Sequence, residues 1–491
     1  MKMKQSQTAV FAGLCCGLYA ASAATIVKTN NVDDLNLPSS WVGGAVPGAA
    51  DVAQWDATVT GANSVVLGAD LAWGGIRIAN PGGVVTIGSG NTLALGASGI
   101  DMGSSTVNLT IQSGLTLLGS RRQLWNVASG RTLTLNTGAF TREPGALLLV
   151  QGSGTISAPA VPNDATGLVG PWAHLGSGSA TRYIAINAGT VAAYNGTVVA
   201  NAAGVTDTTG TANYEVGAGG TVGAGASVHT LRYTGGAATI SGAFEADGLM
   251  HCGSGTLTVG GPVTVGGGRE LVVLLPSGQQ VTLAGALSNN AAGASALVKG
   301  GSGQLRLQGE YAFTGPITVG EGTLQLAPPT SGGIVPCDVF LNSGGNLQYN
   351  SGSSQTFTGV IAGPGQIYKW NGGVWTLAGS NTFEGSVQIY AGTVRLAHPK
   401  ALGAMTGGTQ LRRHDDGNRG RVELNGISTD EPFSFEDGGT AGSSLGFGGY
   451  LDNDNTATNA TLTGPITLNK HGTFRGNGTM ILAGSVSGPG N

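Results

Sequence analysis

Charged side chains are scarce in this chain of 491 residues, where Asp, Glu, Lys and Arg together make up 10% of the sequence. Ordinary globular proteins carry about a quarter. The formal net charge is −4, whereas a surface for nucleic acid needs clustered Lys and Arg. The one dense basic stretch, 412–421, contains its own acids, so we expect a solvated loop with internal ion pairs. The sequence therefore predicts no nucleic-acid partner.

Helical periodicity and long apolar runs are also missing. After the first twenty-odd residues, no long stretch repeats apolar positions at helical spacing. No apolar run of the roughly 18 residues that a spanning helix needs follows the N-terminal segment. These absences exclude a helical bundle and a helical membrane protein.

Cysteine is rare, with four in the chain, and Cys15 and Cys16 lie in the N-terminal apolar segment. Cys252 and Cys337 remain, and neither has a CxxC partner or a histidine at metal-site spacing. We therefore expect no cysteine metal site. Two alternatives remain for this pair, a disulfide or two buried free thiols, because the sequence does not fix the distance between their Cα atoms.

Glycine and alternating apolar residues dominate instead. Gly accounts for 89 residues and hydrophobic residues for 40% of the chain. Glycine lacks the period of three that collagen requires, and the apolar rows exceed what a disordered chain contains. Short strands with alternate apolar positions, entered through Gly or Gly-Pro corners, fit this composition. Leu305 and Leu307 are thus predicted to point inward, and Gln304 and Arg306 outward.

A block of about thirty residues occurs twice, as Lys299–Leu326 and Lys369–Leu396. The two copies align without a gap, with glycines, lysines and Phe313 and Phe383 at matching positions. Self-similarity at fixed spacing indicates stacked units that bury their apolar edges against their neighbours. We therefore predict an all-β solenoid.

Both copies resemble the autotransporter-associated β-strand repeat, also called the passenger-associated transport repeat. The matching positions are Gly303, Leu305, Leu307, Gly309, Phe313, Gly315, Val319, Gly322 and Leu324 in the first copy, and Gly373, Leu377, Gly379, Asn381, Phe383, Gly385, Ile389, Gly392 and Val394 in the second. Tyr311, Trp375, Ile317 and Val387 depart from the pattern. The resemblance implies a right-handed single-stranded parallel β-helix on a bacterial surface, and it implies neither catalytic residues nor a ligand.

The chain divides into three expected regions. Residues 1–23 read as a secretory signal peptide, with Lys2 and Lys4 before an apolar run and a small-x-small site at the end. Residues 24–60, with Trp41 and Trp55, are predicted to cap the first open end of the stack. The β-helix is expected over 61–491, with repeats near 297–327 and 367–397, and the last residues resemble the lead-in to a further repeat, so we expect it to continue beyond Asn491.

Coils of about 22 residues, which the resembling folds imply, would give roughly twenty coils and a rod on the order of 90–100 Å at about 4.8 Å per coil. Residues 156–250, which contain Pro159, Pro162 and Pro171, are expected to form extruded loops, with regular strands resuming near Thr256. A second polar insertion is expected from Ala397 to about Gly439.

Four patterns that could carry chemistry favour structural explanations. A G-x-S-x-G match at 442–446 lacks the helix of a nucleophile elbow. Asp452-Asn453-Asp454-Asn455 lacks the spaced acids of a calcium loop, and Asp415 and Asp416 have arginine neighbours as salt partners. The six histidines are scattered and are expected on the surface or in loops: His174, His229, His251, His398, His414 and His471. We predict no catalytic, cofactor or metal residue.

The favoured function is that of an exported, non-enzymatic β-helical surface or extracellular protein, acting as a stalk, adhesin or matrix component. It would be monomeric and carry no cofactor, and outward ladders of Thr, Ser, Asn and Gln would suit carbohydrate or cell-surface ligands. Secretion or display on a Gram-negative-type cell is expected, with any outer-membrane association supplied by a part beyond Asn491. The rival hypothesis is a β-helical polysaccharide lyase or glycoside hydrolase with its site at 156–250 or 397–440.

Overall fold

The computed structural model describes residues 23–413, 418–436 and 447–489, and these residues form a β-solenoid of about 19 turns. The described residues contain no α-helix, only three short 3-10 turns: η1 (Pro38–Ser40), η2 (Gly178–Ala180) and η3 (Ala202–Gly204). Neighbouring strands are parallel except where β15 and β16 form a hairpin. The prediction of an all-β parallel solenoid is confirmed.

The first sixteen strands form one sheet system, here called the first stack. They are β1 (Thr25–Val27), β2 (Val52–Asp56), β3 (Asn63–Val65), β4 (Leu71–Ala79), β5 (Val85–Ile87), β6 (Thr92–Met102), β7 (Leu109–Ile111), β8 (Gly114–Leu117), β9 (Arg122–Val127), β10 (Thr132–Leu135), β11 (Phe140–Arg142), β12 (Leu147–Gly152), β13 (Thr155–Ser157), β14 (Ala173–Leu175), β15 (Arg182–Asn187) and β16 (Thr190–Ala193).

The remaining strands form the second stack, whose faces are sheets of twelve, thirteen and seven strands plus one strand pair. The twelve-stranded sheet contains β17 (Thr197–Val199), β18 (Asn213–Val216), β20 (Ala226–Tyr233), β22 (Phe244–His251), β24 (Val263–Val265), β25 (Glu270–Leu274), β27 (Leu287–Ser288), β28 (Ala296–Gly300), β30 (Tyr311–Ala312), β31 (Ile317–Val319), β34 (Val339–Leu341) and β37 (Ile361–Ala362). The thirteen-stranded sheet contains β19 (Gly220–Thr221), β21 (Ala238–Ser241), β23 (Thr256–Val259), β26 (Gln280–Leu283), β29 (Gln304–Leu307), β32 (Gly322–Leu326), β35 (Gly345–Asn350), β38 (Gln366–Trp370), β40 (Val387–Ile389), β42 (Thr409–Leu411), β44 (Phe433–Phe435), β47 (Ile466–Leu468) and β50 (Val486–Ser487). The seven-stranded sheet contains β33 (Gly333–Val335), β36 (Gln355–Phe357), β39 (Val374–Leu377), β41 (Gly392–Leu396), β43 (Gly420–Glu423), β45 (Phe447–Asp452) and β48 (His471–Arg475), and the pair is β46 (Ala460–Leu462) with β49 (Met480–Leu482).

Apolar side chains stack on like side chains inside each coil. Leu305 pairs with Leu324 and Leu324 with Leu347 in adjacent parallel strands, and all three are fully buried. Gln304 and Arg306 on the same strand are only partly buried. The alternation predicted for this strand is confirmed, and it assigns one face of each rung to the core.

Three tryptophans fill the core at the N-terminal end of the first stack. The rings of Trp41 and Trp55 lie 5.8 Å apart and those of Trp41 and Trp73 lie 5.7 Å apart, each pair edge to face. The indole N–H of Trp41 donates to the Leu35 carbonyl at 2.8 Å, and that of Trp55 to Asn63 at 2.9 Å. All three rings are buried. The N–H groups of Trp41 and Trp55 keep a hydrogen-bond acceptor there, as buried indoles usually do.

A glycine and a lysine make the same corner in both repeats. The fully buried Lys299 donates its ammonium to the carbonyls of Gly301 and Glu321, and Lys369 donates to those of Trp370, Asn371 and Ala391. Burial lowers the pKa of each lysine to about 7. One coil later, Gly322 and Gly392 have φ of +70° and +71°. A Cβ atom on either glycine would lie 2.6 Å from the lysine nitrogen, so glycine leaves the space that the ammonium occupies.

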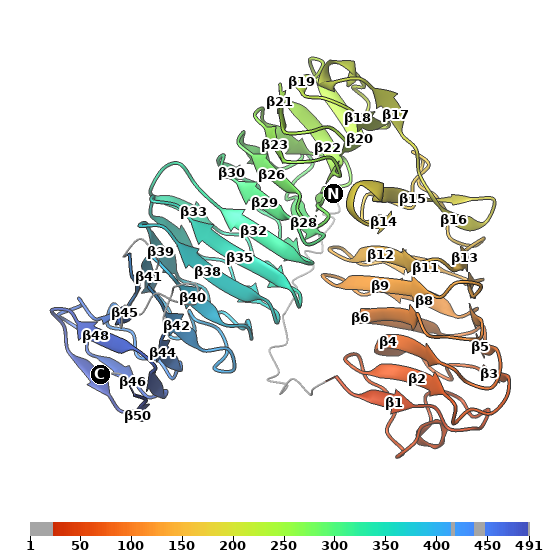
Figure 1. Cartoon of the computed structure of the whole chain (residues 1–491), viewed down its shortest axis with the longest axis horizontal. Helices are drawn as coiled ribbons and strands as arrows, with labels where there is room; N and C mark the ends of the chain where they lie inside the picture. The colour runs from red at the N-terminus through yellow and green to blue at the C-terminus, as the bar shows by residue number, and fades with distance from the viewer. Residues whose placement is uncertain (1–22, 414–417, 437–446, 490–491) are drawn as a thin grey trace, which may run out of the picture.

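The two stacks lie side by side as the arms of an arch (Figure 1). Arg142 pairs with Glu270 at 2.6 Å, and Asn342 donates to the Ser120 carbonyl at 3.1 Å. Leu147 shares an apolar cluster with Leu274 and other residues of the second stack. The expectation of a rod is therefore wrong, because the chain reverses direction after the first stack and packs back on it.

The reversal occupies part of the region expected to form extruded loops. The hairpin β15–β16 closes the first stack, and parallel strands resume at Thr197, not near Thr256. Strands β20 and β22 have long buried runs, since Arg232 of β20 donates to the Thr181 carbonyl and Met250 of β22 packs in the apolar cluster of the first stack. Burial on both faces removes the alternation that marks a half-exposed strand, so the sequence of this region carries no period-two pattern.

The second expected insertion, from Ala397 to about Gly439, is likewise built into the stack. Strands β42, β43 and β44 continue the parallel ladders of the coils before them. The two remaining cysteines are separate: Cys252 and Cys337 are buried free thiols, so the disulfide alternative is wrong.

A charge placed on an inward position should open the stack. Leu377→Asp puts a carboxylate at a fully buried position, and we expect the free energy of unfolding to fall by roughly 3–5 kcal/mol. Thr376→Asp, one residue away and facing outward, is the matched control and should change it by less than about 1 kcal/mol. Urea unfolding of both variants tests this, and equal midpoints would contradict the assigned faces.

Substitution of the corner glycine should lower the free energy of unfolding about as much as substitution of a core residue. Gly392→Ala strains a left-handed backbone and forces its methyl group against Lys369, so we expect a loss of roughly 2 kcal/mol or more. Gly372→Ala, where a Cβ would have open space, should be nearly neutral. The measurement is again urea unfolding, and a tolerated Gly392→Ala would refute the corner arrangement.

Candidate functional site

Several of the residues weighed from the sequence fall outside the described residues. These are the G-x-S-x-G match at 442–446, the pair Asp415 and Asp416, and His414. Of the basic stretch that surrounds the pair, Arg421 makes ion pairs with Asp452 and Asp454 of the next coil. The acids expected to neutralise that arginine therefore come from a neighbouring rung of the stack.

The polar turn Asp452–Asn455 is held by arginines and backbone groups. Asp452 is almost fully buried and bonds to Arg475 at 3.0 Å as well as to Arg421. Asn453 accepts from the Gly426 backbone N–H at 2.8 Å. Within the described ranges, no group of three or more His, Cys, Asp or Glu side chains could hold a metal ion. The turn is thus explained by cross-rung pairing.

Four histidines lie on strands, and His471, at the start of β48, is exposed as expected. The other three are mostly buried, so their expected surface position is wrong. His174 is in β14, and burial with the nearby charge of Arg122 lowers its pKa to about 4. His251 ends β22 and contacts the Gly255 carbonyl at 2.9 Å. His229 lies in β20. His398 accepts from the Lys400 backbone in a turn, as the expectation had it.

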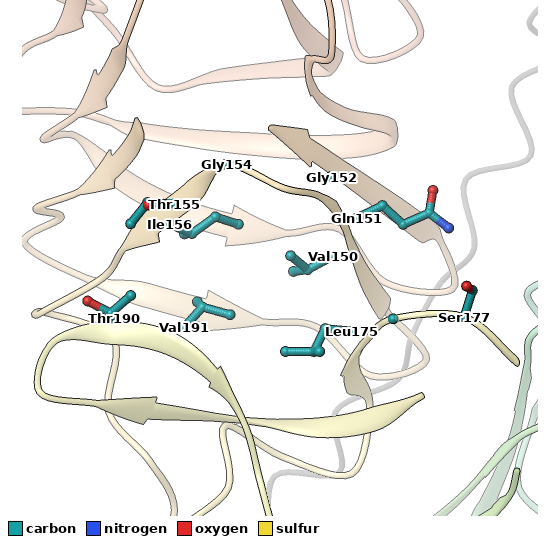
Figure 2. Close-up of a pocket in the computed structure, with 11 residues that line it drawn as sticks. Val150, Gln151, Gly152, Gly154, Thr155, Ile156, Leu175, Ser177, Thr190 and Val191 are labelled. Carbon is teal, nitrogen blue, oxygen red and sulfur yellow. The ribbon is translucent and has the colours of Figure 1, made fainter. Parts of the chain in front are cut away.

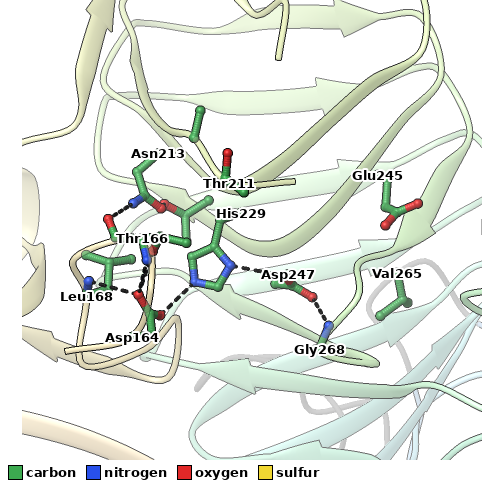
Figure 3. A network of polar contacts seen from close by, with 12 residues as sticks. Asp164, Thr166, Leu168, Thr211, Asn213, His229, Glu245, Asp247, Val265 and Gly268 are labelled. Carbon is green, nitrogen blue, oxygen red and sulfur yellow. Dashed lines mark hydrogen bonds and ion pairs between the residues drawn. The ribbon is translucent and has the colours of Figure 1, made fainter. Parts of the chain in front are cut away.

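His229 is the centre of a charged cluster at the reversal of the chain (Figure 3). Its Nε2 lies 3.1 Å from Asp164 and its Nδ1 lies 3.1 Å from Asp247. Asp247 is on the neighbouring strand β22, whereas Asp164 belongs to the loop that precedes β14. The backbone N–H groups of Leu168 and Gly268 add hydrogen bonds to the two carboxylates.

The electrostatics of this cluster favour a permanent imidazolium. Burial alone would lower the pKa of His229, but the hydrogen bonds and charges of Asp164 and Asp247 outweigh it and raise that pKa to about 9. Burial favours the neutral form of Asp164, yet its bonds from His229 and Thr166 lower its pKa to about 2. A protonated ring held by two carboxylates has no lone pair with which to act as a base near neutral pH. The cluster fastens residues 158–172 between β13 and β14, here called the linking loop, to the second stack.

The sequence offers only part of this cluster. His229 and Asp247 are 18 positions apart and face each other across one rung, so a search for opposite charges one coil apart could find them. Asp164 is 65 positions from His229 and reaches it only because the chain reverses. No periodic pattern marks that contact.

A cavity of about 630 Å³ opens where the last coil of the first stack separates from the hairpin (Figure 2). Val150, Ile156, Leu175 and Val191 line its interior, and hydroxyl and amide groups of Thr155, Thr190, Ser177 and Gln151 stand at its two ends. The ladder between β12 and β14 stops at Val150 and Leu175, although β12 runs on to Gly152. The cavity is a gap between diverging strands, and both apolar and uncharged polar side chains line it.

Together, the fold and these sites define a parallel β-solenoid repeat protein. The passenger-associated-transport-repeat family model matches residues 297–326 and 367–396, the same two blocks. The adhesin BmaC autotransporter of Brucella suis biovar 1 (strain 1330) is 29% identical over 456 residues. That alignment covers 80% of this chain and 13% of the relative, so the chain spans about an eighth of its length. The chain thus contains two passenger-associated transport repeats, as the resemblance implies.

No solved structure matches the chain significantly. Among the described residues, no helix is long and apolar enough to cross a membrane.

The charged cluster around His229 should make the free energy of unfolding depend on pH. In the unfolded chain histidine has a pKa near 6.5, and in the folded chain the value is about 9, so the folded state binds the proton more tightly. The stabilisation is complete below about pH 6.5 and disappears as the pH rises through about 9, amounting to about 3 kcal/mol.

The test compares urea unfolding of the natural chain and of His229→Gln across this range. We expect the difference between their unfolding free energies to be largest near pH 6 and to shrink by pH 10. His398→Gln, in an exposed turn, is the control and should follow the natural chain. If the difference in unfolding free energy between His229→Gln and the natural chain does not vary with pH, the assigned ion pairs of His229 are contradicted.

Proposed function

We propose that this chain is a surface-exposed solenoid segment of an exported bacterial protein and that it acts in adhesion. The observation that carries the proposal is that the two matched repeats lie in one continuous stack, separated by the coil that contains β35. The similarity to a protein named as an adhesin autotransporter supports the same role.

The physical properties of the stack suit such a role. Each coil adds an interface to the coil before it, so an elongated protein gains stability with length without needing a globular core. The chain has few charges and its two remaining thiols are buried, so the stability of the stack depends little on the ionic or redox conditions outside a cell. The basic start, apolar run and small-x-small site of residues 1–23 support export.

The cluster around His229 supports a mechanical role. Asp164, His229 and Asp247 connect the linking loop to the second stack, and Arg142 and Glu270 connect the two stacks directly. An arch fastened at several points can present outward faces on both arms in a fixed orientation. Adhesion benefits from that rigidity, because less conformational freedom is lost when a ligand binds.

The proposal is tested in the producing bacterium with an epitope tag in the exposed 177–179 turn of the full gene product. We expect external protease to remove the tag from intact cells, and deletion of the gene to reduce attachment to surfaces or host cells several-fold. A product lacking residues 1–23 is the control and should stay protected inside. Protection of the full product, or attachment unchanged by deletion, would overturn the proposal.

A further inference from the structure

The outward face of the thirteen-stranded sheet carries an unbroken row of polar side chains, here called the polar column. It runs from Thr239 to Ser487, and strand register places each member directly above the next. Its C-terminal part consists of Gln348, Tyr368, Gln388, Gln410, Ser434 and Thr467. Adjacent rungs are about 4.8 Å apart. The column therefore repeats hydrogen-bonding groups at a regular interval along the solenoid axis.

Aromatic rings stand beside the amides in the middle of this column. The Tyr368 hydroxyl donates to Gln366 at 2.5 Å, and the Tyr390 hydroxyl donates to Gln388 at 3.0 Å. The Tyr390 ring stacks on Trp370, with centroids 4.1 Å apart and planes 8° from parallel. These rings point away from the solenoid core and are only partly buried. Tyr and Trp at such positions combine an apolar body with a polar edge, which suits binding surfaces.

The amides retain unused hydrogen-bonding capacity toward solvent. Gln388 donates to Ser386 at 3.3 Å and accepts from Tyr390. A primary amide has two N–H donors and two carbonyl lone pairs, so one donor and one acceptor remain beyond these contacts. Since Gln388 is half-buried, its bonds to Ser386 and Tyr390 fix its rotamer before any ligand arrives.

The column leads into a hollow at its C-terminal end. Gln410, Ser434 and Thr467 line a depression of about 210 Å³, with the Gly-Pro corner at Pro465 and the exposed Met405 on its sides. A ligand lying along the column would thus pass from a flat amide and aromatic face into a concave seat. Concave seats with a few fixed polar groups are the usual setting of specific ligand binding.

Periodicity and charge together select the ligand class. The members from Gln348 to Thr467 are uncharged. The neighbouring Arg412 donates to Gln410 at 3.0 Å and lies over the Tyr390 ring, so the column lacks the repeated cations that a nucleic acid or an acidic polysaccharide requires. The strands of this sheet are already paired with their neighbours along the stack, whereas an added peptide strand needs an open edge. An uncharged polymer of hydroxylated rings has repeating donors and acceptors that can follow the rungs.

We propose that the polar column from Gln348 to Thr467 binds an uncharged linear polysaccharide along the solenoid axis. The sugar hydroxyls replace water on Gln388, Gln410 and Tyr368, and the hollow beside Thr467 holds one end of the bound segment. The assignment rests on the proposed function, since it requires that the chain meet polysaccharides outside the cell.

The test is retardation of the purified full chain in native gels that contain a linear uncharged β-glucan, a galactomannan or a linear galactan, with alginate as the charged comparator. We expect retardation by at least one uncharged polymer and none by alginate. The double variant Tyr368→Ala/Gln388→Ala should weaken the apparent Kd at least ten-fold. Thr86→Ala/Thr110→Ala, on an outward threonine row of the first stack, is the matched control and should bind like the natural chain.

Urea unfolding of each variant separates binding from folding. If the column only stabilises the stack, the Tyr368→Ala/Gln388→Ala chain will unfold earlier and still be retarded equally, which overturns the proposal. Retardation by alginate alone, or by none of the uncharged polymers, overturns it as well. A chain that reaches the cell surface and promotes attachment without retardation refutes this site and leaves the adhesion role standing.

Discussion

Rung-on-rung stacking of inward apolar side chains is the interaction on which the rest of this structure depends. One row in the second stack contains Leu257, Val281, Leu305, Leu324 and Leu347, each fully buried and each paired with the next. Because the side-chain period along a strand is two, a slip of one residue would exchange the buried and outward sets throughout a coil. The register that fills the core therefore also fixes the polar column on the outside.

The corners are the second constraint, because every coil must turn within a few residues. In the two repeats a buried lysine satisfies carbonyl groups that the turn leaves without strand partners, and a left-handed glycine one coil later leaves room for it. Lys28 does similar work near the N-terminal end, where it donates to the Asn31 carbonyl at 3.0 Å. Unpaired buried carbonyl groups are costly. That cost explains why a chain with few charges keeps lysines at its corners.

Much of the fold could be predicted from the sequence because stacking leaves a periodic trace. The alternation at Gln304–Leu307 and the duplicated blocks follow directly from local geometry. The reversal could not be predicted in the same way, since contacts such as Ser120 with Asn342 join distant segments. One trace of it was present: the apolar run Leu271–Leu275 is too continuous for a strand with one solvent face, and Val272 and Leu274 pack on the first stack. The cluster at His229 escaped prediction for the same reason, because Asp164 arrives only through the reversal.

Distances between spin labels on the polar column test the stacking most directly. With the natural cysteines replaced by alanine, a label at Thr258 would be paired in turn with labels at Gln348, Gln388 and Ser434, which register places four, six and eight rungs away. Parallel stacking predicts separations that grow linearly, to about 19, 29 and 38 Å at about 4.8 Å per rung. Separations that stay constant, or that fall as the labels move along the chain, would contradict the parallel stack.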